Sequence, residues 1–126
     1  MSVVAPGWEL DVERGPDWLL VRVRPSEDGD SESLPLEPAL WNLLQQHLTY
    51  RLVLELDEVE LLDSFLIGQL VALYRRIRQH DGVMRLCGLS AYNRQVLHTC
   101  RLDERLMPYH DRREAVMASG CRVRPK

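Results

Sequence analysis

Four carboxylates gather over residues 57–63, near the middle of the chain: Asp57, Glu58, Glu60 and Asp63. Carboxylate oxygens are ligands that Mg²⁺ prefers, so one hypothesis is a magnesium site at the end of a strand, as in phospho-acceptor receiver domains. The absence of any internal lysine argues against that class, because the only lysine is the C-terminal Lys126. Carboxylates this close in a loop are more often simply solvated, and we expect no metal site here.

Other reactive side chains lack the spacing of a catalytic or metal site. His98 and Cys100 are two residues apart on a predicted helix and point to different faces, so this helix alone does not bring them together as a dyad. The other histidines are interpreted as surface residues: His47, His80 and His110. The cysteines are odd in number and widely spaced, which favours reduced thiols: Cys87, Cys100 and Cys121. Without a recognisable nucleophile-base pair or a glycine-rich phosphate loop, we expect neither an enzyme nor a cofactor.

The composition predicts one domain spanning residues 1–126. With 45% hydrophobic residues among 126, the chain can bury a core of its own. Sixteen basic against nineteen acidic residues leave a net charge of -3, which predicts no attraction to nucleic acid or anionic lipid. Apolar runs are broken well before the roughly 20 residues of a membrane helix, and residues 1–10 have no signal-peptide pattern. We therefore expect a cytoplasmic protein that does not enter the membrane.

The N-terminal part of the chain predicts a β-hairpin. Trp8–Glu13 alternates apolar and polar residues, which predicts an edge strand, and residues 14–17 supply a turn. Trp18–Val23 predicts the second strand, which Pro25 ends. The acidic segment 26–33 has no apolar residue and predicts a loop.

The next two elements are a predicted helix over residues 38–48 and a predicted strand over residues 51–56. In the helix, apolar residues recur at the three-to-four spacing of an amphipathic face: Leu40, Trp41, Leu43, Leu44 and Leu48. The short apolar strand is typical of the centre of a sheet and places alternate leucines on one face: Leu52, Leu54 and Leu56.

A long helix after Asp63 is the best-defined predicted element. It ends near His80, and we expect Gly82 to take the positive φ of a helix C-cap. At about 100° per residue, four apolar residues form one core-facing stripe, flanked by Ile67 and Tyr74: Leu66, Leu70, Leu73 and Ile77.

The remaining predicted elements again alternate between strand and helix. They are a strand at 83–87, a helix at 91–100 capped by Ser90 with Val96 and Leu97 inward, a strand near 106–107 and a helix at 111–118. Helices between successive strands favour an α/β fold, with a mixed sheet and four helices packed against it. We expect the domain core over residues 8–118 and a short tail over residues 119–126.

With its segments in this order, the stretch 52–115 resembles the STAS family, the domain of bacterial anti-sigma factor antagonists and of sulfate-transporter tails. Residues 51–64 resemble the family's central strand, loop and Asp-Ser motif, here Asp63 and Ser64. The Gly-Leu-Ser sequence at 88–90 is similar to the ending of the family's next strand. The other matching positions are Gly68, Leu70 and Leu73 in the long helix, and 97–115 for the closing helix, strand and terminal helix.

The resemblance implies a non-enzymatic interaction module of the anti-sigma factor antagonist type, acting in transcription or stress signalling. The implied partner is an anti-sigma factor or an anti-sigma-type serine kinase. Two alternatives stay open: a STAS domain that binds a nucleotide or another small ligand, and a scaffold subunit of a signalling complex.

The family's antagonists are phosphorylated on a serine two residues after the aspartate, a position that is Phe65 in this chain. Phenylalanine has no hydroxyl, so either Ser64 is the phosphoacceptor or the domain binds constitutively. We favour constitutive binding, because a serine at a helix start more often caps an N–H group. Asp63 is also expected to stabilise the positive end of the helix.

Phe65 falls opposite the apolar stripe of the long helix. It either folds back onto Leu61 or Leu62, or faces a partner as an aromatic anchor, with small neighbours allowing close approach. The expected partner-binding residues are Asp63, Ser64, Phe65, Gly68, Gln69 and Ala72.

Overall fold

Six strands form one sheet whose spatial order follows the chain, from β1 to β6. The computed structural model describes residues 2–5, 7–26, 35–106 and 108–117. The strands are β1 Ser2–Ala5, β2 Trp8–Arg14, β3 Leu19–Pro25, β4 Arg51–Glu55, β5 Val83–Cys87 and β6 Pro108–Tyr109. The helices are α1 Glu37–Gln46, α2 Ser64–Gln79, α3 Ala91–Thr99, α4 Asp103–Leu106 and α5 Arg112–Met117.

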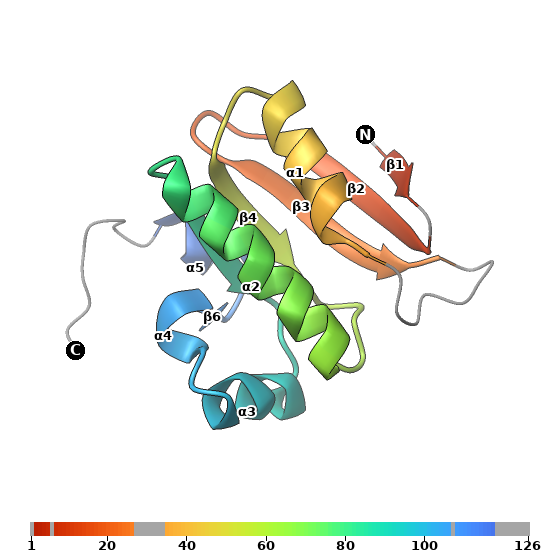
Figure 1. Cartoon of the computed structure of the whole chain (residues 1–126), viewed down its shortest axis with the longest axis vertical. Coiled ribbons are helices and arrows are strands. Elements are labelled where there is room, and N and C mark those ends of the chain that lie inside the picture. The colour runs from red at the N-terminus through yellow and green to blue at the C-terminus, as the bar shows by residue number, and fades with distance from the viewer. Residues whose placement is uncertain (1, 6, 27–34, 107, 118–126) are drawn as a thin grey trace.

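The sheet is mixed, as predicted for an α/β fold. Strands β1, β2 and β3 pair antiparallel, and β2 with β3 forms the predicted hairpin. Strands β3 to β6 are parallel, because a helical crossover returns the chain to the same end of the sheet each time. Helices α1 and α2 cross one face of the sheet, and α5 lies behind it (Figure 1).

The main core lies between the sheet and helices α1, α2 and α3. Alternation along β4 sends Leu52 and Leu54 into this core, and Leu56 follows just after the strand, as predicted. The α2 stripe packs against them, with each residue at most 5% exposed: Leu66, Leu70, Leu73 and Ile77. Burial of this apolar area is the main driving force for the fold.

A second, smaller cluster lies on the opposite face, under α5. It contains Trp18, Leu20, Val53, Cys87 and Ala115. The fully buried guanidinium of Arg85 lies 4.8 Å from the centre of the Trp18 ring, and its Nη1 donates to the Ala115 carbonyl at 2.6 Å. A cation at the last turn of a helix also meets the negative end of the helix dipole. Arg85 therefore holds the C-terminal end of α5 on the sheet.

Strand β2 is not at the edge of the sheet, so that prediction was wrong. The four residues Ser2–Ala5 pair along its outer side as β1, with Val3 opposite Leu10. A strand this short gives little alternating pattern, and the sequence did not predict it.

The predicted core role of Leu48 was also wrong. Helix α1 ends at Gln46, and Leu48 takes a left-handed conformation with φ 54 and is 89% exposed. Its N–H donates to the Gln45 carbonyl at 3.2 Å, and the Thr49 N–H donates to Leu44 at 3.1 Å. This pattern is a Schellman ending, which turns the chain away before the side chain can reach the core.

Helix α2 ends in the same way, but the left-handed residue is Asp81 (φ 60), not Gly82 as predicted. The Gly82 N–H closes the helix by donating to the Ile77 carbonyl at 2.9 Å. Glycine is needed at 82 for a different reason: a Cβ there would overlap the Tyr50 backbone and come within 2.7 Å of the Ile77 side chain.

The C-terminal half of the domain has one more helix than predicted. Among the described residues there are five helices, because the four-residue α4 precedes the last strand. Strand β6 begins at Pro108, whereas we expected it near 106–107, and Met107 lies outside the described residues. The predicted acidic loop, apart from Ser26, and the tail 119–126 also lie outside them. In the described part of the chain, no helix has the length and apolar character needed to cross a membrane.

Candidate functional site

The start of α2 is built by Asp63, which is its N-cap residue. The Asp63 backbone is extended, and its Oδ1 accepts a hydrogen bond from the Leu66 N–H at 2.8 Å. This bond satisfies one of the free N–H groups of the first turn and places a carboxylate at the positive end of the helix dipole. Ser64 is the first helical residue and is exposed. The capping role predicted for Ser64 therefore belongs to Asp63.

Phe65 points away from the main core. Its side chain is 39% exposed, whereas Leu66 beside it is 5% exposed and packs in the main cluster. This orientation agrees with the helical spacing, which placed Phe65 opposite the apolar stripe. Leu62, one of the two residues onto which Phe65 could have folded, is itself a core residue.

Three exposed apolar side chains belong to segments at this end of the molecule, and we call them the Leu61–Phe65–Tyr92 patch. Leu61 is 53% exposed in the loop before α2, and Tyr92 is 63% exposed in the first turn of α3. Figure 1 shows α3 at the same end of the molecule as the start of α2. Among the described residues, the only other large exposed apolar side chains are those of Leu48 and Met117.

Asn93 joins two of the segments that carry the patch, the loop before α2 and the start of α3. Asn93 is fully buried, and its Oδ1 accepts from the Leu62 N–H at 3.0 Å. Its Nδ2 donates to the carbonyls of Val59 at 3.1 Å and Glu60 at 3.3 Å. Leu61 is thus held beside the turn of α3 that carries Tyr92. The sequence does not predict this role of Asn93, because no local pattern reveals a contact between segments more than 30 residues apart.

The other predicted binding residues on α2 have different surroundings. Gly68 and Ala72 are exposed, and a Cβ added at Gly68 would meet nothing within 4 Å. Gln69 is half-buried, and its Oε1 accepts from the backbone N–H groups of Leu36 and Glu37, both at 2.9 Å. Gln69 therefore fixes the start of α1, a structural role that the sequence did not predict.

The four carboxylates at 57–63 do not converge on one point. Within the described ranges, no group of three or more His, Cys, Asp or Glu side chains is arranged to hold a metal ion. Asp63 is the α2 cap, and Glu58 lies 3.9 Å from Arg22. Asp57 packs against Gly88, where φ is 75 and a Cβ would collide with the carboxylate.

The histidine and thiol side chains likewise show separate roles. His98 pairs with Asp103 at 3.0 Å, and this hydrogen bond holds the pKa of the Asp103 carboxyl below its usual value. The His80 ring packs 4.5 Å from the Tyr50 ring. Burial raises the pKa of the Cys87 thiol to about 12, so it carries no nucleophilic thiolate near neutral pH. Cys100 is exposed, and Cys121 lies outside the described residues.

A second cluster of charged side chains surrounds the buried carboxylate of Glu55, which is 2% exposed. Its two oxygens accept from Arg22 at 2.9 Å and from Nε of Arg112 at 2.6 Å, and Arg112 also donates to Glu13 at 2.7 Å. The hydrogen bond to Glu55 raises the pKa of Arg22. The pKa of Arg112 is also raised, because its bonds to carboxylates outweigh the effect of burial.

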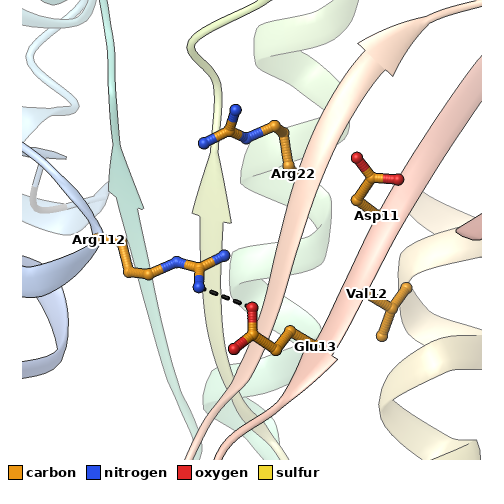
Figure 2. A pocket seen from close by; sticks show the side chains of 5 residues that line it. All are labelled: Asp11, Val12, Glu13, Arg22 and Arg112. Carbon is orange, nitrogen blue, oxygen red and sulfur yellow. Dashed lines mark hydrogen bonds and ion pairs between the residues drawn. The ribbon is translucent and has the colours of Figure 1, made fainter. Parts of the chain in front are cut away.

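The outer side of this cluster is a pocket of about 470 Å³. Figure 2 shows its lining: Asp11, Val12, Glu13, Arg22 and Arg112. Both arginines are already paired with carboxylates, so an anionic ligand would have to displace those contacts. The cluster therefore ties α5 to β2, β3 and β4.

These features define a small mixed α/β domain with an apolar surface patch at the start of α2. The STAS domain model matches residues 12–115, and the chain therefore belongs to the STAS family. No curated protein matches the sequence.

Solved structures with a similar fold support this assignment. An anti-sigma factor antagonist from Mycobacterium paratuberculosis is 23% identical, with 92% of this chain and 97% of that chain covered and a TM-score of 0.67. An anti-sigma factor antagonist (STAS) domain protein from Planctomyces limnophilus is 23% identical, with coverage of 86% and 96% and a TM-score of 0.60. A candidate anti-sigma factor antagonist from Thermotoga maritima is 23% identical, with coverage of 85% and 91% and a TM-score of 0.62. Because the sequence identities are only 23%, these structural similarities establish a shared fold and nothing about function.

Proposed function

We propose that this STAS domain is a non-enzymatic interaction module that binds an anti-sigma factor or an anti-sigma-type serine kinase. Through this contact it would act as an anti-sigma factor antagonist in transcription or stress signalling. The observation that carries the proposal is the outward-facing Phe65 at the Asp63-capped start of α2. Membership of the STAS family and the fold shared with anti-sigma factor antagonists support it.

The chemistry of the Leu61–Phe65–Tyr92 patch suits a protein partner. Aromatic side chains at the centre of an interface contribute most of its binding free energy when the surrounding contacts exclude water. Glu60 directly precedes Leu61 and is exposed, and the exposed Asp63 lies two residues before Phe65 in the chain. Exposed carboxylates next to exposed apolar side chains favour a partner whose surface has an apolar pocket with basic residues beside it.

Binding under this proposal is constitutive. The position that carries the family's phosphoserine is Phe65, which cannot be phosphorylated. Ser64 is exposed and its hydroxyl is not required as the cap, so it is the residue to test as a phosphoacceptor. A phosphate there would add about -1.5 to -2 charge next to Asp63. Incubation with the partner kinase and mapping by mass spectrometry should leave Ser64 unmodified, and stoichiometric phosphate on Ser64 would replace constitutive binding with a switch.

The main test is the substitution Phe65→Ala, with Leu48→Ala as the matched control. Both residues are exposed apolar side chains, but Leu48 follows α1, outside the patch. Removing the aromatic anchor should weaken binding to an anti-sigma kinase from the same genome at least tenfold, or about 1.4 kcal/mol. Calorimetry measures the affinity, and urea unfolding should show nearly unchanged stability for both variants.

Two results would contradict the proposal. If Phe65→Ala unfolds the domain, the ring is a core residue and not an anchor. If both variants bind as tightly as the original chain, the partner contacts another surface.

A further inference from the structure

We propose that Asn93 is a positioning residue, which holds the 59–62 loop in the shape that a partner recognises. This inference rests on the proposed function, because it assigns the pre-organisation of the same docking surface to a residue of α3. Asn93 itself is fully buried and cannot touch a partner. Its effect would be transmitted entirely through the backbone of the loop.

The contacts of Asn93 match the hydrogen-bonding capacity of an asparagine side chain. The amide oxygen accepts from the Leu62 N–H at 3.0 Å, and the amide nitrogen donates to the Val59 carbonyl at 3.1 Å and the Glu60 carbonyl at 3.3 Å. The amide thus uses one acceptor and both donors on three backbone groups of one loop. Among the standard side chains, only asparagine offers this combination at this length.

The backbone of Asn93 is fixed as well. Ser90 caps α3, and its Oγ accepts from the Asn93 N–H at 3.1 Å. Three residues later in the same helix, Val96 packs against the main core, as does Leu97, which is fully buried. The helix is therefore a rigid support from which the amide reaches the loop.

These bonds decide which loop side chain faces outward. The side chains of Val59 and Leu62 are 5% and 2% exposed, whereas Leu61 between them is 53% exposed. Asn93 binds the backbone on both sides of Leu61, so the loop is held with Val59 and Leu62 inward and with Glu60 and Leu61 outward. Without the amide, the loop would sample other conformations, and only the fraction that presents Leu61 correctly beside Phe65 would bind.

The experiment compares Asn93→Ala and Asn93→Asp with Asn42→Ala and Asn42→Asp. Asn42 is the only other asparagine in the sequence, and it is exposed on α1. Asn93→Asp preserves the side-chain volume and the acceptor for Leu62 but removes the two amide donors. Amide hydrogen exchange by NMR reports on the loop without any partner, and calorimetry with the anti-sigma kinase used for Phe65 reports on docking.

In the original chain the Leu62 amide should be protected from exchange before any partner is added. Asn93→Ala should raise its exchange rate at least about tenfold while the amides of β4 stay protected, because only the loop is released. Affinity for the kinase should fall by about tenfold through a slower association rate, since fewer molecules present the correct loop. Asn93→Asp, whose carboxylate would face the carbonyls of Val59 and Glu60 without a donor, should raise the exchange rate of Leu62 at least as much as Asn93→Ala. Both Asn42 variants should behave as the original chain.

Each other result overturns the inference in a recognisable way. A Leu62 amide that exchanges freely in the original chain shows that the loop is not fixed by Asn93. A released loop with unchanged affinity shows that the loop shape does not matter for docking. The proposed function then still stands if Phe65→Ala weakens binding. If the original chain does not bind the kinase at all, the proposed function fails, and the positioning role fails with it.

Discussion

The two faces of the sheet are held by different interactions. The face under α1, α2 and α3 is lined almost wholly by aliphatic side chains that form one continuous core. The face under α5 has only a small apolar cluster, together with the buried carboxylate of Glu55 and the buried guanidinium of Arg85. The difference indicates that the first face supplies most of the folding free energy, whereas directional contacts on the second face fix where α5 sits.

Strand β4 carries both environments on successive residues. Val53 and Leu54 are each fully buried, but Val53 faces the small cluster and Leu54 the main core. Glu55, next in the strand, is on the same side as Val53 and binds Arg22 and Arg112. One strand therefore allows the two faces to be compared with neighbouring substitutions.

The largest effect is expected for Leu54→Ala on the main-core face. Truncating a fully buried leucine among close-packed neighbours should lower the free energy of unfolding by about 2 to 5 kcal/mol, and Val53→Ala by roughly 1 to 2 kcal/mol. Urea unfolding followed by circular dichroism measures both values. A Val53 effect as large as that of Leu54 would mean that the small face contributes equally to stability.

A smaller effect is expected for Glu55→Gln, with Glu58→Gln as the control. Removing the buried charge leaves two arginines without their shared carboxylate, but each is partly exposed, so we expect a loss of roughly 1 to 3 kcal/mol. Glu58 is exposed and only 3.9 Å from Arg22, so its substitution should change stability by less than about 0.5 kcal/mol. Equal effects in urea unfolding would show that the buried position of Glu55 gives it no special role.

Near neutral pH, the smallest effect on stability concerns Cys87, on the face under α5. Its thiol has a pKa of about 12, against an ordinary value of 9.0. Below pH 9 the thiol is protonated in both the folded and the unfolded chain. Above pH 9 the unfolded chain loses the proton first, so stability declines as the pH rises from 9 towards 12.

The burial of Cys87 can be checked by alkylation. Iodoacetamide at pH 8 should modify the exposed Cys100 and leave Cys87 intact until the chain is denatured, as peptide mapping by mass spectrometry can check. Rapid labelling of Cys87 in the folded chain would mean that α5 does not cover it.

The elements that bury a regular apolar stripe could be predicted from the sequence. The α2 stripe from Leu66 to Ile77 and the alternation of Leu52 and Leu54 in β4 are periodic in the sequence. These residues face the core in the folded domain, as their spacing predicts. The short elements β1 and α4 could not be predicted, and β6 was expected near 106–107 although it begins at Pro108, because these elements contain too few residues to show a period. Their positions depend on neighbours that the chain meets only after folding.

The candidate site could be predicted in part. The exposure of Phe65 followed from the position of one residue relative to the stripe. The roles of Gln69 and Asn93 did not, because each amide binds backbone groups more than 30 residues away in the sequence. The choice of Asp63 over Ser64 as the cap depended on a local backbone angle that both residue types can adopt.

The order of the strands in the sheet has a consequence for synthesis of the chain. Every strand from β2 onward pairs with the strand that precedes it in the sequence. As the chain leaves the ribosome, each new strand therefore finds its partner already made, and the sheet can extend along one edge without waiting for a distant segment. The helices between the parallel strands are released in time to cover the growing core, which limits how long the apolar edge of a nascent sheet is exposed to other chains.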